Sequence, residues 1–426
     1  MHATALRTHA ASALTHVLTF RQAADAALSA YGREHRTLGP RERLALADTV
    51  YAVLRQWPRM EALAMAHPTW TRMPPAQRKA MVAHHAVLLA WAVLGDGFAP
   101  LLAQAQTADD APWLAACLPW LQAPAAASLA ALQAQVHANS GAPWPLSAPL
   151  NPSQGLAFAA QAPAWLAARM LELWPDQAPS VWDAMRQNAP LDVRINPLKA
   201  KPAQVLQALQ DAGLTAHALP HTPGALRLQG KPNLSKTPPF EQGWLEVQDE
   251  GSQRLAQWVA PKRNELVVDF CAGAGGKTLA MGAAMRNTGR LYAMDTSAHR
   301  LEGLQPRLQR SGLSNVHTLV LAHEHDERLQ RLWQKADRVL VDAPCSGSGT
   351  LRRSPDVAWR QTPSDVADLH QTQSSILARA AQLVKPGGRL VYATCSWLTD
   401  ENEDVARAFA AAHRDFVPLP QKHEHS

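Results

Sequence analysis

Cysteine is scarce in this sequence: the 426 residues contain only four, Cys117, Cys271, Cys345 and Cys395. So few thiols do not form a disulfide framework, and such sparse use in a long chain is typical of a reducing compartment. We therefore expect a cytoplasmic protein. A chain of this length exceeds one ordinary hydrophobic core, so we also expect two or three domains.

Long apolar runs are missing as well. The longest, residues 81–94, contains His84 and His85 and is shorter than the roughly 20 residues that a membrane crossing requires. It is typical of a core helix, and no membrane partner is expected. The N-terminus, MHATALRTHAAS, has polar residues where a signal peptide carries its apolar segment, so we expect no export.

The excess of one charge is small. Lys and Arg number 41 against 35 Asp and Glu, which gives a formal net charge of +6. Spread over the whole chain, this favours an anionic partner only mildly and is also compatible with an ordinary soluble surface.

Residues 1–146 have the pattern of an all-helical domain. Alanine and leucine recur at three- and four-residue spacing, as in residues 25–28 and 43–54, and Pro40 precedes the second of these helices. Residues 141–152 contain four prolines, which cannot continue a helix, so we predict a linker there.

Residues 147–243 have the pattern of a small α+β domain. Helices are predicted at residues 163–173 and 202–209, and short strands at 191–195 and 225–228.

Residues 244–426 alternate apolar strands with helices, which indicates a parallel α/β sheet covered on both faces. The predicted strands are residues 266–270, 290–294, 316–321, 338–341 and 389–393. In such a Rossmann-like sheet, ligands bind beyond the carboxyl ends of the strands.

The first of these strands runs directly into a glycine-rich turn. Its glycines let the backbone approach a ligand closely, and the amides of the following helix, expected from about Thr278, can hold an anionic group. The candidate ligand-binding residues in this turn are Cys271, Ala272, Gly273, Ala274, Gly275, Gly276 and Lys277.

Two chemistries are compatible with this turn. The phosphate-binding pattern G-x-x-x-x-G-K-[ST] needs glycine where the chain has Cys271, although Gly276-Lys277-Thr278 and residues 339–342 resemble elements of a nucleotide hydrolase. Asp295 ends the second strand about 20 residues after the glycines, where an acid can bind paired ribose hydroxyls. A nucleoside with an intact ribose therefore fits better, and a nucleotide hydrolase is the alternative.

Cys345 and Cys395 follow the fourth and fifth strands. A single cysteine is most often a small buried residue, but two at the ligand-facing edge of successive strands favour chemistry. Carbon 5 of a pyrimidine is too weak a nucleophile to take a methyl group from a sulfonium. Thiolate attack at carbon 6 activates it, and Asp342 is placed to hydrogen-bond the base and stabilise the adduct.

Three segments together resemble the Sun (Fmu) family of RNA 5-methylcytosine methyltransferases, in its bacterial small-subunit ribosomal RNA branch. They are Asp342-Ala-Pro-Cys-Ser-Gly, Thr394-Cys-Ser and Cys271-Ala-Gly-Ala-Gly-Gly-Lys. The resemblance implies S-adenosylmethionine as cofactor, Cys395 as nucleophile and Cys345 in product release. It assigns cofactor contacts to residues 271–277, Asp295 and Asp342. The residues expected to bind the substrate are Pro344, Arg352 and Arg353.

The resemblance covers most of the chain. Residues 31–54 are similar to part of a NusB-like helical RNA-binding domain, so 1–146 is expected to be that domain, 147–243 a ferredoxin-like domain and 244–426 the methyltransferase. The partner it implies is RNA, most often 16S ribosomal RNA, with no metal and a monomeric enzyme. Arg352 and Arg353 follow the second cysteine motif and are expected to meet phosphates.

The chain departs from the family pattern in the cofactor region. Ala274 stands where proline is usual, which should loosen the turn without removing an amide donor. The aspartate expected after the third strand for the adenine amino group is missing. Glu324 or Asp326 could bind the adenine amino group in its place, and the sequence does not choose between them or require either.

Two further departures concern the covering helix and the end of the chain. Pro306 should bend or shorten the helix at residues 299–310. Relatives continue past residues 421–426 with a hairpin that completes the sheet, so we expect an exposed fifth-strand edge and weakened catalysis. An RNA-binding member without catalysis is therefore a third hypothesis.

Overall fold

The computed structural model describes residues 2–65, 67, 74–122 and 162–419, in two compact units. One unit comprises Met1–Asn188 with Gly347–Pro363, and the other Ala189–Ser346 with Ser364–Ser426. The predicted linker at 141–152 and the C-terminal residues 421–426 lie outside the described residues.

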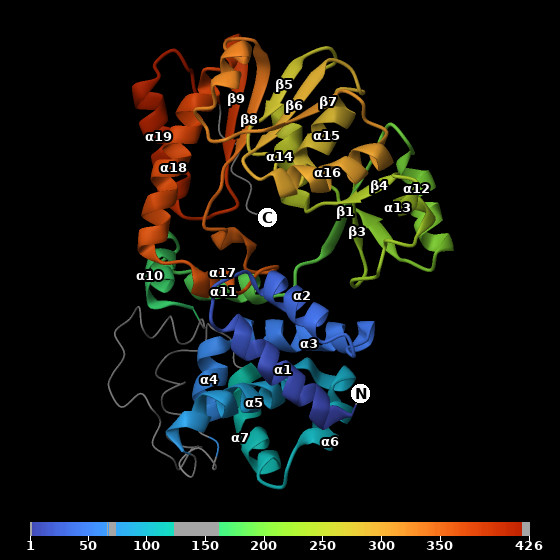
Figure 1. Cartoon of the computed structure of the whole chain (residues 1–426), viewed down its shortest axis with the longest axis vertical. Coiled ribbons are helices and arrows are strands. Elements are labelled where there is room, and N and C mark those ends of the chain that lie inside the picture. The colour runs from blue at the N-terminus through green and yellow to red at the C-terminus, as the bar shows by residue number, and fades with distance from the viewer. Residues whose placement is uncertain (1, 66, 68–73, 123–161, 420–426) are drawn as a thin grey trace. The chain divides into compact units, whose positions relative to one another are not determined.

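The first unit is helical throughout its described residues, which confirms the predicted helical N-terminus (Figure 1). Pro40 occupies the first turn of its helix, where a missing amide hydrogen costs nothing. The helices are α1 (Ala3–Val17), α2 (Ala24–Glu34), α3 (Pro40–Arg55), α4 (Trp57–Met65), α5 (Pro75–Leu94), η2 (Gly95–Gly97), α6 (Ala99–Ala105), α7 (Asp110–Gln122), α10 (Ala164–Leu173), α11 (Ala178–Arg186), η4 (Ser348–Thr350) and α17 (Val357–Arg360).

The core of this unit is built around α5. Val87, Leu88 and Trp91 are fully buried, and the Trp91 indole donates to Thr49 Oγ1 at 2.9 Å. The span Ala80–Gly97 is long and apolar enough to cross a membrane, but half of it is buried in this core and core helices pass the same test. The prediction of a core helix is confirmed.

The segment Gly347–Pro363 belongs to the helical unit although it is inserted in the sequence of the sheet. The buried Asp356 carboxylate accepts the Ala24 amide at 3.2 Å, and the Trp359 indole donates to Leu54 O at 3.2 Å. The chain thus leaves the second unit directly after Ser346 and returns at Ser364.

A small antiparallel sheet opens the second unit, with strand order β2-β3-β1-β4. Val193, Val205 and Leu226 are among the residues that bury its apolar face. The elements are β1 (Leu191–Ile195), α12 (Pro202–Asp211), β2 (Ala216–Ala218), β3 (Ala225–Leu228), α13 (Pro238–Glu241) and β4 (Leu245–Val247). Because Val247 pairs with Val193, this sheet extends past residue 243, where the sequence predicted the domain to end. A three-residue strand carries too little periodicity to be recognised.

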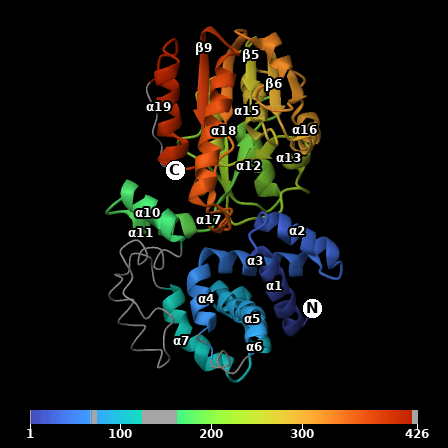
Figure 2. The same ribbon diagram turned by 60° about the vertical axis from the view of Figure 1, so that its left-hand side comes forward.

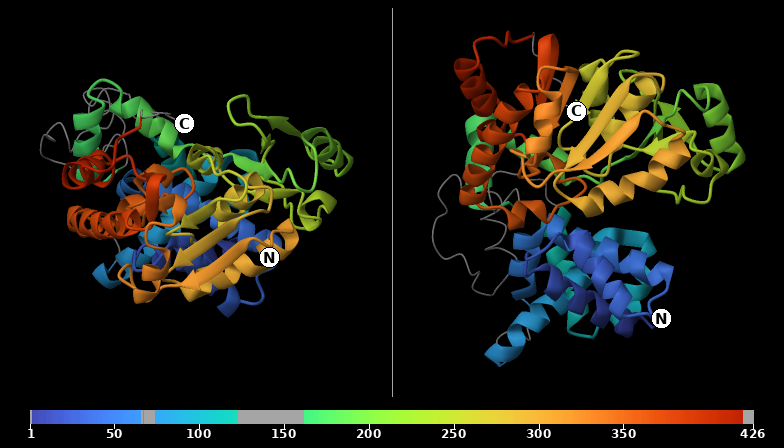
Figure 3. Two further views of the ribbon diagram at one scale, coloured as in Figure 1. Left: turned by 90° about the horizontal axis from the view of Figure 1, so that it is seen from above. Right: turned by 45° about the horizontal axis from the view of Figure 1, so that its top comes forward.

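The larger sheet is parallel, in the order β7-β6-β5-β8-β9, and forms one layer (Figures 2 and 3). This confirms the predicted Rossmann-like fold. Its elements are α14 (Glu250–Val259), β5 (Leu266–Asp269), α15 (Gly276–Ala284), β6 (Arg290–Asp295), α16 (Ala298–Ser311), β7 (Val316–Val320), η3 (Glu327–Leu332), β8 (Ala336–Asp342), α18 (Pro363–Ala381), β9 (Val384–Ala393), η5 (Thr399–Glu401) and α19 (Glu403–Ala412).

Alternate residues of the central strands pack on opposite faces of this sheet. Val268 and Val339 pack with residues of α18 and α19, whereas Val267 and Leu340 pack with α14 and α15. This two-residue period is what burial on both faces requires. Helix α16 runs from Ala298 to Ser311 with Pro306 inside it, so of the two predicted effects, bending and shortening, shortening does not occur.

Candidate functional site

The ligand-facing residues lie at one edge of the parallel sheet, where β5, β6, β8 and β9 end. Asp269 pairs in register with Ala293 and Leu340, and Asp342 with Ala393. The segments that follow these strands therefore start from the same edge, as the fold class predicts.

The glycine turn after β5 has two glycines in the left-handed region, Gly273 at φ 55° and Gly275 at φ 79°. A Cβ on Gly275 would lie 2.3 Å from Leu304 Cδ1, so α16 packs against bare backbone there. Helix α15 begins directly afterwards, at Gly276, and presents its amide end to the turn.

Asp295, at the end of β6, is joined to this turn. Its Oδ2 accepts the Gly273 amide and its Oδ1 accepts the Ser297 amide, both at 2.8 Å. A carboxylate oxygen has further lone pairs, so these two bonds fix the side chain and leave it able to accept from ribose hydroxyls.

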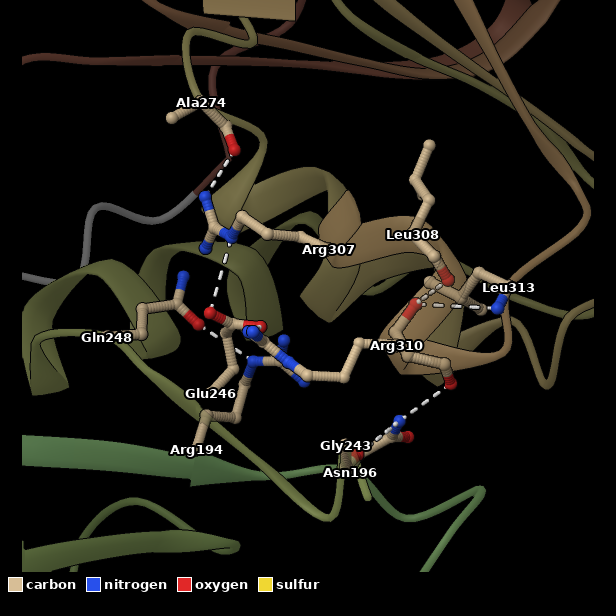
Figure 4. A network of polar contacts seen from close by, with 11 residues as sticks. Arg194, Asn196, Gly243, Glu246, Gln248, Ala274, Arg307, Leu308, Arg310 and Leu313 are labelled. Carbon is tan, nitrogen blue, oxygen red and sulfur yellow. Dashed lines mark hydrogen bonds and ion pairs between the residues drawn. The ribbon is translucent and has the colours of Figure 1, made fainter. Parts of the chain in front are cut away.

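The carbonyl of Ala274 is held from outside the turn (Figure 4). Arg307 of α16 donates to it and also pairs through Nε with Glu246 Oε1 of β4 at 3.2 Å. Arg310 pairs with the other oxygen, Glu246 Oε2, at 2.6 Å. Guanidinium groups thus link the small sheet to the turn at the position where proline was expected, which opposes the predicted loosening.

Asp269 is fully buried below the turn. Its Oδ2 accepts Thr278 Oγ1 at 2.7 Å, whereas Oδ1 has no hydrogen-bond partner among the described residues. Burial, with a smaller contribution from Asp342, raises the pKa of this carboxyl to about 7 despite the Thr278 hydrogen bond.

We predict that Asp269→Asn removes part of the pH dependence of stability. Because the pKa of folded Asp269 is raised above its ordinary 3.8, its stabilising contribution is complete below about pH 4 and is lost as the pH rises through about 7. The free energy of unfolding of the variant minus that of wild type should therefore rise by about a few kcal/mol from pH 5 to pH 8. Urea titrations at both pH values test this, with exposed Asp415→Asn as control. An equal difference at the two pH values contradicts the assignment.

Cys345 and Cys395 come together at the same edge, with their sulfur atoms 3.2 Å apart. Cys395 is exposed and Cys345 partly buried. The hydrogen bond from Cys345 lowers the pKa of Cys395, and Lys277 contributes in the same direction, against the opposing effects of burial and Asp342. A lowered thiol pKa increases the fraction of nucleophilic thiolate near neutral pH.

Lys277 connects the glycine turn to this pair of thiols. Its Nζ lies 2.5 Å from Asp342 Oδ2, and both side chains are partly exposed. The other two cysteines differ. Burial raises the pKa of Cys117 to about 12 and raises that of Cys271 as well, so both are expected to be inert.

The two acids predicted as candidates for binding the adenine, Glu324 and Asp326, both make contacts within the protein. Asp326 accepts a hydrogen bond from the Ala322 amide at 3.0 Å and forms an ion pair with Arg328. Both contacts stabilise the turn that contains Asp326. Glu324 accepts Ser375 Oγ at 2.7 Å. Neither side chain is singled out for the adenine.

Arg352 and Arg353 lie in the segment Gly347–Pro363 and are described with the helical unit. Arg352 donates to Asn188 O at 2.9 Å, and its own carbonyl accepts from Arg55.

Sequence reasoning missed two residues at the site, Glu401 and Asn402. Glu401 is completely buried and accepts the Ser346 amide at 2.7 Å, and Asn402 Oδ1 accepts Thr394 Oγ1 at 2.6 Å. They follow Cys395 in an irregular segment, so no periodicity marked them. Only the acid-amide pair itself could have drawn attention to them.

Among the described residues, one cluster in the helical unit has the ligand types of a metal site. His67 Nε2 lies 3.1 Å from Asp110 Oδ1, and buried His85 stacks on His67 with ring centroids 3.9 Å apart. Stacked imidazoles do not aim their in-plane lone pairs at one ion, and Arg7 lies 3.8 Å from Asp110 and already supplies positive charge. We assign no metal to it.

A glycine turn joined to the acid of the next strand, on a five-stranded parallel sheet, places the second unit in the class of Rossmann-like domains. Residues 256–425 match the family model described as 16S rRNA methyltransferase RsmB/F. Residues 162–235 match the ferredoxin-like domain described for RsmF/B-like methyltransferases. These matches place residues 256–425 in the RsmB/F methyltransferase family and residues 162–235 with its ferredoxin-like domain.

Curated relatives and solved structures agree with this placement. The chain is 38% identical over 260 residues to "Probable ribosomal RNA small subunit methyltransferase B" of Synechocystis sp., covering 61% of this chain and 58% of the relative. It is 36% identical over 256 residues to ribosomal RNA small subunit methyltransferase B of Sodalis glossinidius, covering 59% and 58%. The chain thus spans less than two thirds of the length of these relatives.

Two solved structures extend the comparison. A methyltransferase homologue from Pyrococcus horikoshii is 30% identical, with a TM-score of 0.55 over 62% of this chain and 83% of that one. The protein PH0851 is similar over 100% of this chain and 93% of its own, with a TM-score of 0.75 and 24% identity, which shows a common fold.

Proposed function

We propose that this protein transfers a methyl group from S-adenosylmethionine to carbon 5 of a cytosine in RNA, with 16S ribosomal RNA as the substrate. The observation that carries the proposal is the pair of sulfur atoms 3.2 Å apart at the edge that also holds the glycine turn. The match of residues 256–425 to the RsmB/F family supports RNA as the substrate.

The residues of the turn fit the cofactor. Left-handed Gly273 and Gly275 keep the backbone free of side chains, the start of α15 suits the carboxylate of the amino-acid part, and Asp295 suits the ribose. When bound, S-adenosylmethionine supplies an electrophilic methyl group. Holding that group at the strand edge is the task of residues 271–277, Asp295 and Asp342.

The Cys395 thiolate is proposed to attack carbon 6 of the cytosine and form a sulfur–carbon bond. The electron pair of the 5,6 double bond then makes carbon 5 nucleophilic, and carbon 5 takes the methyl group as S-adenosylhomocysteine leaves. Loss of the carbon 5 proton re-forms the double bond and expels the Cys395 thiolate. At 3.2 Å from the departing sulfur, Cys345 is placed to move a proton in this last step.

Asp342 is proposed to bind the edge of the cytosine. Its Oδ2 is paired with Lys277, which leaves Oδ1 to accept the amino group of the base, and Pro344 lies next to it on the same segment. A target base in structured RNA must leave its stack to reach this edge.

The helical unit is proposed to bind RNA as a NusB-like domain, with Arg352 and Arg353 near phosphates. The domain boundary near residue 146 is a proposal, as are a monomeric state and a cytoplasmic location. Both matched families are methyltransferases, which favours this function over a nucleotide hydrolase. An RNA-binding protein of the same fold without catalysis is the second candidate.

Incubation of small subunits or their RNA with methyl-labelled S-adenosylmethionine tests the proposal. Label should appear as 5-methylcytosine after nuclease digestion. RNA binding without label transfer would favour the non-catalytic candidate, and magnesium-dependent ATP turnover without affinity for S-adenosylmethionine would defeat the proposal.

Arg307→Met should weaken S-adenosylmethionine binding by about three- to tenfold, because the Ala274 carbonyl loses the donor that ties it to α16 and Glu246 keeps only Arg310 of its two arginine partners. Calorimetry measures the dissociation constant directly. Glu302→Gln, an exposed residue on the same helix, is the control. Unchanged affinity in Arg307→Met would show that the turn needs no support from α16.

A further inference from the structure

The two loops that carry the paired cysteines are each held by one of two consecutive residues, Glu401 and Asn402, at the end of η5. Glu401 is buried in the sheet unit, and its neighbour Asn402 is partly buried at the start of α19. Glu401 hydrogen-bonds the loop of Cys345, and Asn402 hydrogen-bonds the loop of Cys395.

Glu401 holds the loop around Cys345. Its Oε1 accepts the Ser346 amide at 2.7 Å, and its Oε2 accepts Ser346 Oγ at 2.5 Å. Gln373 of α18 donates to Glu401 Oε1 at 3.0 Å and also to Pro344 O at 2.9 Å. The residues on both sides of Cys345 are therefore fixed by one buried carboxylate and its amide partner.

Asn402 holds the loop around Cys395. Its Oδ1 accepts Thr394 Oγ1 at 2.6 Å, and its Nδ2 donates to Ser396 O and Leu398 O, both at 2.9 Å. Thr394 in turn accepts the Ser396 amide at 3.1 Å. The residues on both sides of Cys395 are thus fixed by a single side-chain amide.

The two loops also meet directly, because Ser346 Oγ lies 3.4 Å from Ser396 Oγ. The Tyr392 hydroxyl at the end of β9 donates to the Glu401 carbonyl at 2.6 Å, which fixes the backbone between the two holding residues to the sheet. Displacement of either residue must therefore change the distance between the sulfur atoms.

We propose that Glu401 and Asn402 are positioning residues that set the separation of the Cys345 and Cys395 sulfur atoms, and so the proton transfer between them. This rests on the proposed function, in which both thiols act on one base. Glu401 is buried and its carboxylate accepts three hydrogen bonds. A side chain that donates a hydrogen bond at this position therefore cannot replace it.

The first experiment uses the full chain with Glu401→Gln, in which one oxygen becomes an amide donor facing Ser346. We expect kcat for RNA methylation to fall about a hundredfold, with the KM for S-adenosylmethionine and for RNA changed less than about threefold. The matched control is Glu403→Gln, an exposed acid two residues later that should keep wild-type kinetics. Wild-type kcat in Glu401→Gln would overturn the proposal.

A second readout does not depend on methyl transfer. A trivalent phenylarsenical binds two thiols together only when they are close, so its affinity reports the separation of the Cys345 and Cys395 sulfurs. We expect tight binding of the arsenical by wild type and by Glu403→Gln, and binding at least about tenfold weaker by Glu401→Gln. Cys345→Ser should bind little, and the binding that it retains measures the contribution of the other thiols. Arsenical affinity equal to wild type in Glu401→Gln would overturn the proposal.

Asn402→Ala and Asn402→Asp provide the test if Glu401→Gln fails to fold. Aspartate can still accept from Thr394 but cannot donate to the two carbonyls, so we expect intermediate arsenical affinity for Asn402→Asp and the weakest for Asn402→Ala. Equal affinity in both variants and wild type would overturn the proposal. If wild type binds the arsenical as expected but methylates no RNA, the proposed function fails while the positioning role stands.

Discussion

Replacement of Cys395 by alanine should abolish methyl transfer to RNA, with a loss of at least about a thousandfold in kcat, while S-adenosylmethionine still binds. The reason is chemical: without the thiolate, carbon 5 of the cytosine is not activated. Calorimetry measures cofactor binding, and label transfer to RNA measures kcat. Transfer by the variant at more than a few per cent of the wild-type rate would exclude Cys395 as the nucleophile.

Cys345→Ala is the matched variant and should behave differently. The Cys395 adduct should still form but should not resolve, so a covalent protein–RNA band is expected on denaturing gels. The same variant removes the hydrogen bond that lowers the pKa of Cys395, so alkylation of Cys395 by iodoacetamide should need a higher pH than in wild type. An adduct that persists in Cys395→Ala would reverse the two roles.

Asp295→Ala should weaken S-adenosylmethionine binding by about 10- to 100-fold, the second large effect. The substitution removes the acceptor for ribose and also releases the Gly273 and Ser297 amides, which both donate to this carboxylate at 2.8 Å. Calorimetry with S-adenosylhomocysteine measures the change without turnover.

Asp295→Asn separates these two contributions. Its remaining oxygen can accept one of the two amides, whereas its NH₂ group opposes the other, so affinity between that of wild type and that of the alanine variant is expected. Exposed Asp415→Asn serves as the control. Affinity equal to wild type in Asp295→Ala would remove this residue from the cofactor site.

Much of the fold could be predicted from the sequence because the strands of the larger sheet are buried on both faces and bounded by polar turns. Strand β1 and strand β3 have the predicted limits, Leu191–Ile195 and Ala225–Leu228. Strand β4 was missed as part of the small sheet because three residues carry no period, and its place depends on pairing with β1. Pro306 does not shorten α16, which continues past it to Ser311, so that one of the two predicted effects does not occur.

The site divides in the same way. Residues in short motifs, such as Gly275 and Cys345, could be predicted because turn chemistry and thiol chemistry are local properties of sequence. Glu401, Asn402 and Arg307 could not, since each acts by reaching a segment distant in the chain, and no local pattern specifies such a partner. The 3.2 Å separation of the sulfurs belongs to this second group.

Because the segment Gly347–Pro363 belongs to the helical unit, fragments of this protein must be chosen with that segment in view. A fragment that begins after Asn188 would keep this segment but lose the Ala24 amide and the Leu54 carbonyl, to which Asp356 and Trp359 bind. The Trp359 indole would then lack its acceptor, and the Asp356 carboxylate would keep Arg360 but not the Ala24 amide. The N-terminal helices thus behave as a folding partner of the catalytic chain, and truncation experiments should not treat them as a detachable module.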